Sequence, residues 1–348
     1  MSRTALPPTP APSRRTPPRI VRLVTRPGPW RRGRIPAALA LLLGLLLMLH
    51  AHLTDRFGLG SLVETFLPWC GALVPLLLLC GLWRRSAAAL VALLVPTVVW
   101  VSMFGSVFSD RSSGAGGDLT VAEHNVAEAN PDPAGTARSL AGSGADVLAL
   151  VEVTDQALGT YEKELAGTYP YHAALGTVGL WSKLPLSGVR TVDIRTDAGP
   201  LGATKTAAEK LPGNRALRAT VATDRGPLAV YVAHLGSVRV MPRGGFWTES
   251  RDRNATALGE ALAAERSARV VLLGDLNGTT DDRAFDSLTD GLRSAQDESG
   301  SGFGFTWPAS FPMVRIDQIL LRGVHAEKSW VLPGTGSDHL PVAADISW

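Results

Sequence analysis

The stretch Arg269-Val270-Val271-Leu272-Leu273-Gly274-Asp275-Leu276-Asn277-Gly278 decides how the C-terminal part of this chain is organised. Its first half is a short apolar run with β-branched residues, typical of a strand buried on both faces, and the run stops at Gly-Asp-Leu-Asn-Gly. Asp275 and Asn277 are two residues apart, so an extended backbone presents both side chains on the same side. The pattern predicts a strand end with a chemical role or, more simply, an Asx-rich turn that closes a strand.

Composition and charge divide the 348-residue chain into unlike parts. Apolar residues make up 45% of it and the mean hydropathy is positive, which indicates that part of the chain lies in lipid. The first 105 residues contribute +10 to a net charge of +3, so residues 106–348 carry −7. An acidic domain disfavours tight, non-specific binding of nucleic acid. Both cysteines, Cys70 and Cys80, lie in one apolar segment, so the C-terminal part has no disulfide framework.

Residues 1–34 are rich in Pro and Arg and lack the apolar side chains needed to offset the entropy of ordering. They predict a disordered basic tail. A secretory signal peptide is the alternative, because arginines precede an apolar run. That run, residues 35–53, is about as long as a bilayer-spanning helix and is not followed by a small-residue cleavage site, which favours a membrane span.

Three apolar runs without formal charge follow the tail, at about 35–53, 66–83 and 87–104. Each is long enough to span a bilayer if Pro75 and Pro96 are accommodated as kinks. Residues 35–105 therefore predict three transmembrane helices, rather than a buried core of a soluble protein.

The arginines near these runs predict their orientation. Nine arginines in the tail, and the pair Arg84-Arg85 between the second and third runs, place both regions in the cytoplasm. Three spans then deliver the remainder of the chain to the outer side of the membrane. Residues 106–117 are rich in Ser and Gly and predict a flexible linker, which leaves 118–348 as one large domain.

Helical and extended patterns in residues 118–348 indicate an α+β domain. Early in the domain the two alternate, and later short strands are joined by turns. Expected strands lie at 119–122, 147–151, 216–223, 228–234 and 270–273, and expected helices at about 136–143 and 249–266. Mixed sheets layered with helices explain this order better than a purely parallel sheet.

Polar residues recur where the apolar strands end. They are Asn125, Glu152, His234, Asp275 with Asn277, Asp317 after an expected strand over 313–316, and the pair Asp338-His339 before a further strand. Singly, each has an ordinary explanation, such as a hydrogen-bonded core histidine, a solvated strand end or a turn cap. Together they predict one site at the edge of the core.

These stretches, with Trp181-Ser-Lys-Leu-Pro-Leu, Arg315-Ile-Asp-Gln-Ile and Ser337-Asp-His-Leu-Pro-Val, resemble the endonuclease/exonuclease/phosphatase superfamily. That superfamily includes deoxyribonuclease I, apurinic endonucleases, sphingomyelinases and inositol polyphosphate 5-phosphatases. The resemblance covers residues 118–348 and none of 1–117. It implies a four-layered α/β sandwich of two packed mixed β-sheets flanked by helices. Lys183 stands where arginine is common, and residues 239–248 match nothing in the family, which leaves substrate selection open.

The residue types fit hydrolysis of a phosphoester, which requires neutralised phosphoryl charge, a positioned water and a stabilised leaving oxygen. Glu152 offers a hard carboxylate ligand for Mg²⁺, or Mn²⁺ as an alternative, with Asn125 and Asp338 as companions. The absence of Cys from residues 118–348 and the scarcity of clustered His argue against structural zinc.

The remaining polar residues have catalytic roles in this interpretation. Asp275 would orient or deprotonate the water, and Asn277 would donate a hydrogen bond to a phosphoryl oxygen. His339, held by Asp317, would stabilise developing charge or act as the acid, and His234 would do likewise from the other side. Which group is base and which is acid stays open, because members of the family differ.

Two classes of function compete. The first is a membrane-anchored, metal-dependent phosphodiesterase with nuclease-like chemistry, or alternatively a phosphoesterase acting on phospholipids or inositol phosphates. The second is a membrane-tethered binding module without catalysis, which the retained polar strand ends disfavour. The acidic domain weakens a DNA substrate and the membrane spans favour a lipid headgroup, but the sequence does not choose between nucleic acid and lipid. It indicates no obligate protein partner.

Overall fold

The computed structural model describes residues 28–114, 116–194 and 214–348. Residue contacts divide the chain into two compact units, of which the first comprises Met1–Leu46 with Gly71–Val99 and the second Leu47–Cys70 with Trp100–Trp348. The predicted disordered tail lies, up to residue 27, outside the described residues. The second unit contains the predicted catalytic domain.

The first unit is helical, and its core is small. Helices α2 (Arg34–Leu49), α4 (Leu73–Trp83) and α5 (Ala87–Phe104) contribute to it, and Ala40, Ala92 and Leu93 form its buried centre. Two helical stretches, Arg34–His52 and Ala87–Phe108, are long and apolar enough to cross a membrane. They coincide with the first and third predicted spans.

The second predicted span, 66–83, is not one continuous α-helix. It consists of a 3-10 helix, Leu67–Ala72, followed by the 11 residues of α4. Pro75 cannot donate a backbone hydrogen bond and its ring clashes with the preceding turn, so an α-helix starts just before it rather than running through it. The two stretches named above qualify as candidate spans by themselves. The stretch Leu67–Trp83 becomes part of a third candidate only if it is counted together with the preceding stretch Arg56–Thr65, from which it is separated by a sharp bend. Three transmembrane helices are therefore not confirmed.

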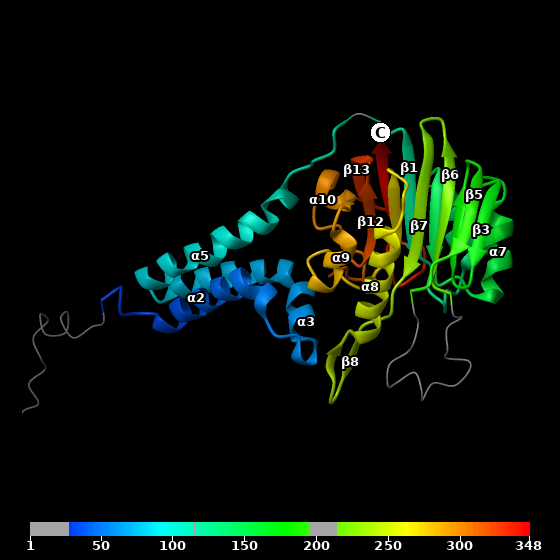
Figure 1. Ribbon diagram of the computed structural model, residues 1–348. Coiled ribbons are helices and arrows are strands. Elements are labelled where there is room, and N and C mark those ends of the chain that lie inside the picture. The colour runs from blue at the N-terminus through cyan, green and yellow to red at the C-terminus, as the bar shows by residue number, and fades with distance from the viewer. Residues whose placement is uncertain (1–27, 115, 195–213) are drawn as a thin grey trace, which may run out of the picture. The chain divides into compact units, whose positions relative to one another are not determined.

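Two six-stranded mixed sheets form the second unit (Figure 1). Sheet A has the order β13 (His325–Val331), β14 (Val342–Ser347), β1 (Leu119–Asn125), β2 (Val147–Val151), β4 (Val178–Ser182), β3 (Tyr171–Leu175). Sheet B has the order β11 (Arg293–Ser294), β12 (Asp317–Arg322), β10 (Val270–Asp275), β7 (Gly226–His234), β6 (Ala216–Thr223), β5 (Leu186–Thr191). Each sheet contains one parallel pair, β1 with β2 and β7 with β10, and antiparallel pairs otherwise.

The sheets pack face to face, and helices cover their outer faces. Alternate residues of both sheets, such as Ala149 of β2 and Leu273 of β10, build a continuous apolar layer between the sheets and are fully buried. Helices α6 (Pro133–Ala141) and α7 (Asp155–Leu165) cover sheet A, and α8 (Glu249–Ala263) covers sheet B. Figure 1 shows α7 and α8 on opposite outer sides of the sandwich. The prediction of two packed mixed sheets flanked by helices is confirmed.

Several predicted boundaries agree with the structure, and one strand was predicted wrongly. The strand predicted at 216–223 is β6, while α6 begins at Pro133, before residue 136, because Asp132 caps its first turn and proline suits the first helical position. The expected strand over 313–316 does not form. Instead, β12 begins at Asp317 and runs antiparallel to β10 with Asp317 opposite Asp275, so its side chain still reaches the expected edge.

The second unit begins well before the predicted domain boundary at residue 118. It includes α3 (Leu59–Thr65), and within the predicted linker a 3-10 helix covers Gly105–Phe108. The Arg111 guanidinium donates to the carbonyl oxygens of Gln296 and Gly300 at 2.9 and 3.2 Å. Part of the predicted linker is thus packed against the domain.

Short elements complete the second unit. The stretch 239–248, which matches nothing in the family, contains a hairpin of β8 (Arg239–Met241) and β9 (Gly245–Trp247). The short helices α9 (Asp286–Thr289) and α10 (Ala295–Ser299) lie between β10 and β12 in the chain. The long connection after β10 is therefore structured, and it begins at the residues that carry the candidate site.

Candidate active site

Three neighbouring strands of sheet B bring polar side chains to one edge. The register places Asp275, the last residue of β10, opposite His234 at the end of β7 and Asp317 at the start of β12. All three lie in phase with the residues that form the layer between the sheets, so alternation along each strand directs them into that space. Asn125, at the end of β1 in sheet A, donates from Nδ2 to Asp275 Oδ2 at 2.9 Å. Both sheets therefore contribute to one site.

Asp275 is at the centre of the site and is only 1% exposed. Besides Asn125, the backbone N–H of Asn277 donates to its Oδ1 at 2.8 Å. Burial desolvates the carboxylate and raises the pKa of Asp275 to about 7, with His339 opposing this rise and Asp317 adding to it. A carboxyl group with a pKa near neutrality is suited to accept a proton from water.

His339 is held by the carboxylate of Asp317. Its Nδ1 lies 2.9 Å from Asp317 Oδ2, and its Nε2 lies 3.8 Å from Asp275 Oδ2. Burial opposes the charge on the imidazole, but Asp317 and Asp275 outweigh this effect and raise the pKa of His339 to about 10. Ser337 fixes the local backbone, because its Oγ accepts from the His339 N–H and donates to the Asn125 carbonyl. His339 is therefore an imidazolium that points into the site.

His234 is held by a guanidinium instead. Arg215 Nη2 lies 2.7 Å from His234 Nδ1, and because a guanidinium only donates, Nδ1 must be the acceptor and Nε2 must carry the proton. Burial, Arg215 and His339 all lower the pKa of His234 well below its ordinary value. Its Nε2 is buried without a hydrogen-bond partner in the described part of the chain, 3.5 Å from Glu152 Oε1 and 3.7 Å from Asp275 Oδ2. His234 thus offers a neutral N–H donor.

Glu152 and Asn277 have left-handed backbone conformations, with φ of 61° and 52°. In residues other than glycine this conformation is uncommon, and each instance costs about 1–3 kcal/mol. At Glu152 it ends the alternation of β2, and the carboxylate accepts from the Glu128 N–H at 2.9 Å while facing His234. The Asn277 amide donates to the Leu235 carbonyl at 3.1 Å and more weakly to Asp275. The Asn277 amide thus donates to protein groups in this structure, and its expected hydrogen bond to a phosphoryl oxygen stays a prediction.

Asp338 lies at the rim of the site. It is exposed, and the Trp307 Nε1 donates to its Oδ2 at 3.4 Å. Among the described residues, no hydrogen bond or ion pair joins Asp338 to Glu152 or Asn125. The structure therefore brings seven of the eight predicted residues into one chain of contacts, and the shared metal site of Asn125, Glu152 and Asp338 remains a prediction.

Two residues of the site were not predicted from the sequence. Glu123 in β1 is fully buried, and neither carboxylate oxygen has a hydrogen-bond partner in the described residues. Burial, with Asp317 and Asp275 nearby, raises the pKa of Glu123 well above its ordinary value. An acidic residue inside an apolar strand was the signal for Glu123. Arg215 had no such signal, because only the fold brings it to His234.

The donor atoms of the site fit a hard divalent cation. Asp275, Asp317 and His339 have ligand atoms within 4.8 Å of one another, but His339 Nδ1 is already hydrogen-bonded to Asp317. Glu152 is more accessible, with 25% of its side chain exposed, and its carboxylate can reach a cation that keeps several waters. Carboxylate and amide oxygens suit Mg²⁺ or Mn²⁺ better than a soft metal.

A segment preceding α4 supports the loop that carries Asn277. The Ser61 hydroxyl of α3 donates to Asp282, and Arg251 of α8 donates to Ser61 Oγ at 3.1 Å and pairs with Asp282 at 2.9 Å. Arg251 is fully buried, and its Nη1 lies 3.5 Å from the Asn277 carbonyl oxygen. We call Ser61, Arg251 and Asp282 the loop support. In the sequence, Ser61 lies in the short connection between the first and second predicted spans.

Two packed mixed sheets with a buried carboxylate and imidazole site at one edge define a class of hydrolases that act on phosphoesters. Residues 122–339 match the model of the Endonuclease/Exonuclease/phosphatase family, and the chain belongs to that family. No curated protein matches the sequence.

Solved structures with the same fold differ widely in sequence. A humanised Danio rerio TDP2 is 19% identical, with a TM-score of 0.51 over 66% of this chain and 98% of that chain. A protein of unknown function from Enterococcus faecalis V583 is 14% identical, with a TM-score of 0.50 over 66% of this chain and 99% of that chain. At these identities the likeness shows the fold alone.

Proposed function

We propose that this protein is a divalent-metal-dependent phosphodiesterase with nuclease-like chemistry. One observation carries the proposal: Asp275, a carboxyl with a pKa near neutrality, lies between the N–H groups of two imidazoles, one neutral and one cationic. A base, an acid and a neutral donor in one site are what phosphoester hydrolysis requires. Membership of the family supports the same reaction class.

Each residue has a distinct role in the proposed reaction. Asp275 accepts a proton from the attacking water, and His339 gives the proton on Nε2 to the leaving oxygen. His234 donates its Nε2–H to a phosphoryl oxygen. Mg²⁺ or Mn²⁺, held by Glu152 with Asn125 and Asp338, would neutralise phosphoryl charge when bound. Asn277 holds Asp275 in place through its backbone N–H.

The substrate is the finer part of the proposal. A Danio rerio TDP2 structure is complexed with a single-strand DNA product, so DNA belongs among the substrates to be tested. The net charge of −7 on residues 106–348 and the two candidate spans favour a phospholipid or inositol-phosphate ester as the second candidate. Both are phosphoesters, and the same catalytic groups serve either.

We place the protein in the cell membrane as a multi-pass protein, with its tail in the cytoplasm and its catalytic domain outside. Support comes from the two candidate spans and from the arginines of residues 1–34. Protease added to intact cells should then remove the catalytic domain. Full protection of the domain until the cells are lysed would reverse this orientation.

The activity is tested with the full chain purified in detergent. Plasmid DNA, RNA, phospholipids and bis(p-nitrophenyl) phosphate are each supplied with Mg²⁺, Mn²⁺ or EDTA. We expect hydrolysis of at least one substrate with a metal and none with EDTA. Glu152→Gln should remove the metal-dependent activity, whereas Glu162→Gln, at a partly exposed position of α7, should not. Unchanged hydrolysis by Glu152→Gln, or in EDTA, would show the proposed metal role to be wrong.

A further inference from the structure

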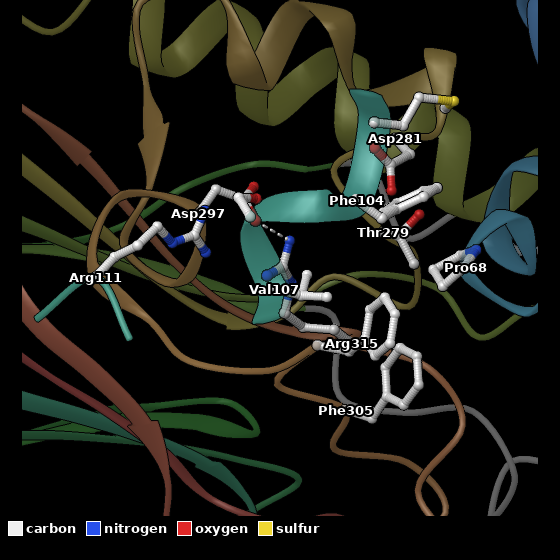
Figure 2. Close-up of a pocket in the computed structure, with 12 residues that line it drawn as sticks. Pro68, Phe104, Val107, Arg111, Thr279, Asp281, Asp297, Phe305 and Arg315 are labelled. Atoms are coloured by element: carbon white, nitrogen blue, oxygen red, sulfur yellow. Dashed lines mark hydrogen bonds and ion pairs between the residues drawn. The ribbon is translucent and has the colours of Figure 1, made fainter. Parts of the chain in front are cut away.

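A cavity of about 320 Å³ lies in the same unit as the candidate active site. Its wall is built from the loop that follows the catalytic Asn277, from the segment that precedes β12, and from the end of α5 (Figure 2). Its volume is at the lower end of the range for small-ligand sites, about 300–1,000 Å³. None of the predicted catalytic residues lines it.

One part of the cavity wall is apolar and aromatic. Phe303 and Phe305 stack with ring centroids 5.0 Å apart, and Phe104 lies 6.2 Å from Phe303. Met103 and Phe104 belong to the helical stretch Ala87–Phe108, which is a candidate membrane span. This wall can bury an apolar group, and aromatic faces also attract organic cations.

The two arginines of the cavity are already engaged. Arg315 donates to Asp297 Oδ1 at 2.8 Å and to Thr280 Oγ1 at 3.2 Å. Arg111 donates to the carbonyls of Gln296 and Gly300. These contacts occupy guanidinium N–H groups that would otherwise be available to an anion.

Two polar groups of the cavity remain without partners. The Thr279 side chain is only 6% exposed, and its hydroxyl has no hydrogen-bond partner among the described residues. The Asp281 carboxylate likewise has no hydrogen bond or ion pair within the described ranges, although solvent reaches it. Figure 2 shows Thr279, Asp281 and Phe104 at one end of the cavity and Arg111 at the other.

Desolvation of the Asp281 carboxylate favours a positive ligand. Desolvation raises the pKa of Asp281; Arg315 and His50 oppose this rise, whereas Asp297 and Glu64 add to it. A raised pKa means that the surroundings disfavour the carboxylate, and a bound cation would relieve that cost. Glu64 is itself paired with Arg283 at 2.7 Å, so it does not supply a competing site.

We propose that this cavity binds the ammonium end of an amphiphile. The N–H groups of a primary ammonium would donate to the Asp281 carboxylate and the Thr279 hydroxyl, and the apolar part would lie against Phe104, Phe303 and Phe305. A membrane lipid with an amino headgroup and a free alkylamine share this chemistry. The site is separate from the proposed phosphoesterase centre and does not depend on turnover.

Binding is measured on the full chain in decyl maltoside, by the shift in thermal unfolding as decylammonium chloride is titrated. We expect saturable binding of decylammonium. Binding should be at least tenfold weaker for ethylammonium, weaker for decyltrimethylammonium and absent for decanoate. Asp281→Asn should weaken decylammonium binding at least tenfold and Thr279→Val severalfold. Asp286→Asn, which makes the same charge change on an exposed residue of α9 outside the cavity, should leave binding unchanged.

Equal binding by wild type and Asp281→Asn, or of decanoate and decylammonium, would overturn the site. If Asp281→Asn does not fold, unchanged binding by Thr279→Val has the same meaning. Equal binding of ethylammonium and decylammonium would refute the proposed contact with an apolar chain and would indicate a small free amine as the ligand. Stabilisation in nanodiscs of phosphatidylethanolamine over phosphatidylcholine, lost in Asp281→Asn, would identify a lipid as the source. Glu152→Gln should bind decylammonium like wild type. A failure of the phosphoesterase proposal would therefore leave this binding test unaffected.

Discussion

The two histidines of the candidate active site face the same carboxylate oxygen of Asp275, and their surroundings differ in charge. His339 lies against Asp317, whereas His234 lies against Arg215. The pKa of His339 is raised to about 10, and that of His234 is lowered well below its ordinary value. For His339 the carboxylates of Asp317 and Asp275 outweigh burial and favour the cation, whereas for His234 burial is the largest cause and Arg215 adds to it, which favours the neutral ring.

This difference assigns different chemistry to two rings that both present Nε2–H to the site. A cationic imidazole can release a proton to a leaving oxygen and return to a neutral ring. A neutral imidazole can donate a hydrogen bond but cannot give up its remaining proton near neutral pH. We therefore expect His339 to be the acid and His234 to be a donor that does not change its protonation.

The largest expected effect is that of removing the acid. His339→Ala should lower kcat by about two to four orders of magnitude with little change in KM, since proton transfer matters in the transition state. The measurement is steady-state kinetics on whichever substrate of the panel the wild type hydrolyses. His325→Ala, at an exposed position, is the control. A His339→Ala variant within tenfold of wild type would remove the distinction between the two rings.

Asp317→Asn should have the next largest effect, about one to two orders of magnitude in kcat. The amide still accepts a hydrogen bond from Nδ1 but no longer favours the imidazolium. The double variant with His339→Ala should be scarcely worse than His339→Ala alone, because the two residues act as a unit. Losses that multiply would mean that Asp317 acts independently of His339.

His234→Gln should cost less than about tenfold, because glutamine supplies an N–H donor in place of the ring. The same replacement at His339 should cost as much as His339→Ala, since an amide cannot transfer a proton near neutral pH. Comparing kcat for the two glutamine variants tests the assignment directly. Similar losses at both positions would show that the rings share one role.

The smallest effect is expected at Arg215. Arg215→Gln keeps a donor for His234 Nδ1 and should remain close to wild type in kcat, whereas Arg215→Met should lose severalfold. Without the guanidinium, nothing requires the proton of His234 to stay on Nε2. Melting temperatures of both variants separate this effect from loss of folding. Equal activity of the two variants would remove Arg215 from the positioning of His234.

The sequence predicted the layers of the domain because alternation and apolar runs are local. The strand predicted at 270–273 lies within β10, and the strand predicted at 216–223 has the same bounds as β6. Asp317 was placed on the wrong side of a strand, yet it still reached the site because β12 runs antiparallel to β10. The wrong strand boundary did not affect the prediction that Asp317 belongs to the site. Its register opposite Asp275 places it at the same edge of the sheet.

Long-range contacts and unusual backbone conformations could not be predicted. The positive φ of Glu152 depends on its surroundings, and neither a propensity nor a period indicates it. Arg215 lies just before β6, and no local pattern indicates that its guanidinium contacts His234 at the end of β7. The helix of Ser61 was unexpected for the same reason, since its partners lie far along the chain.

The loop support and the Glu64–Arg283 ion pair also constrain the order in which the protein can fold during synthesis, because their later partners are made long after α3. Ser61 lies 190 residues before Arg251, and Glu64 lies 219 residues before Arg283. At about 5–20 residues per second, the ribosome needs about 10–40 s to supply these partners. During this interval Glu64 lacks Arg283, and burying its carboxylate without that partner would be costly. The segment around α3 can therefore reach its final packing only after the far end of the chain has been made.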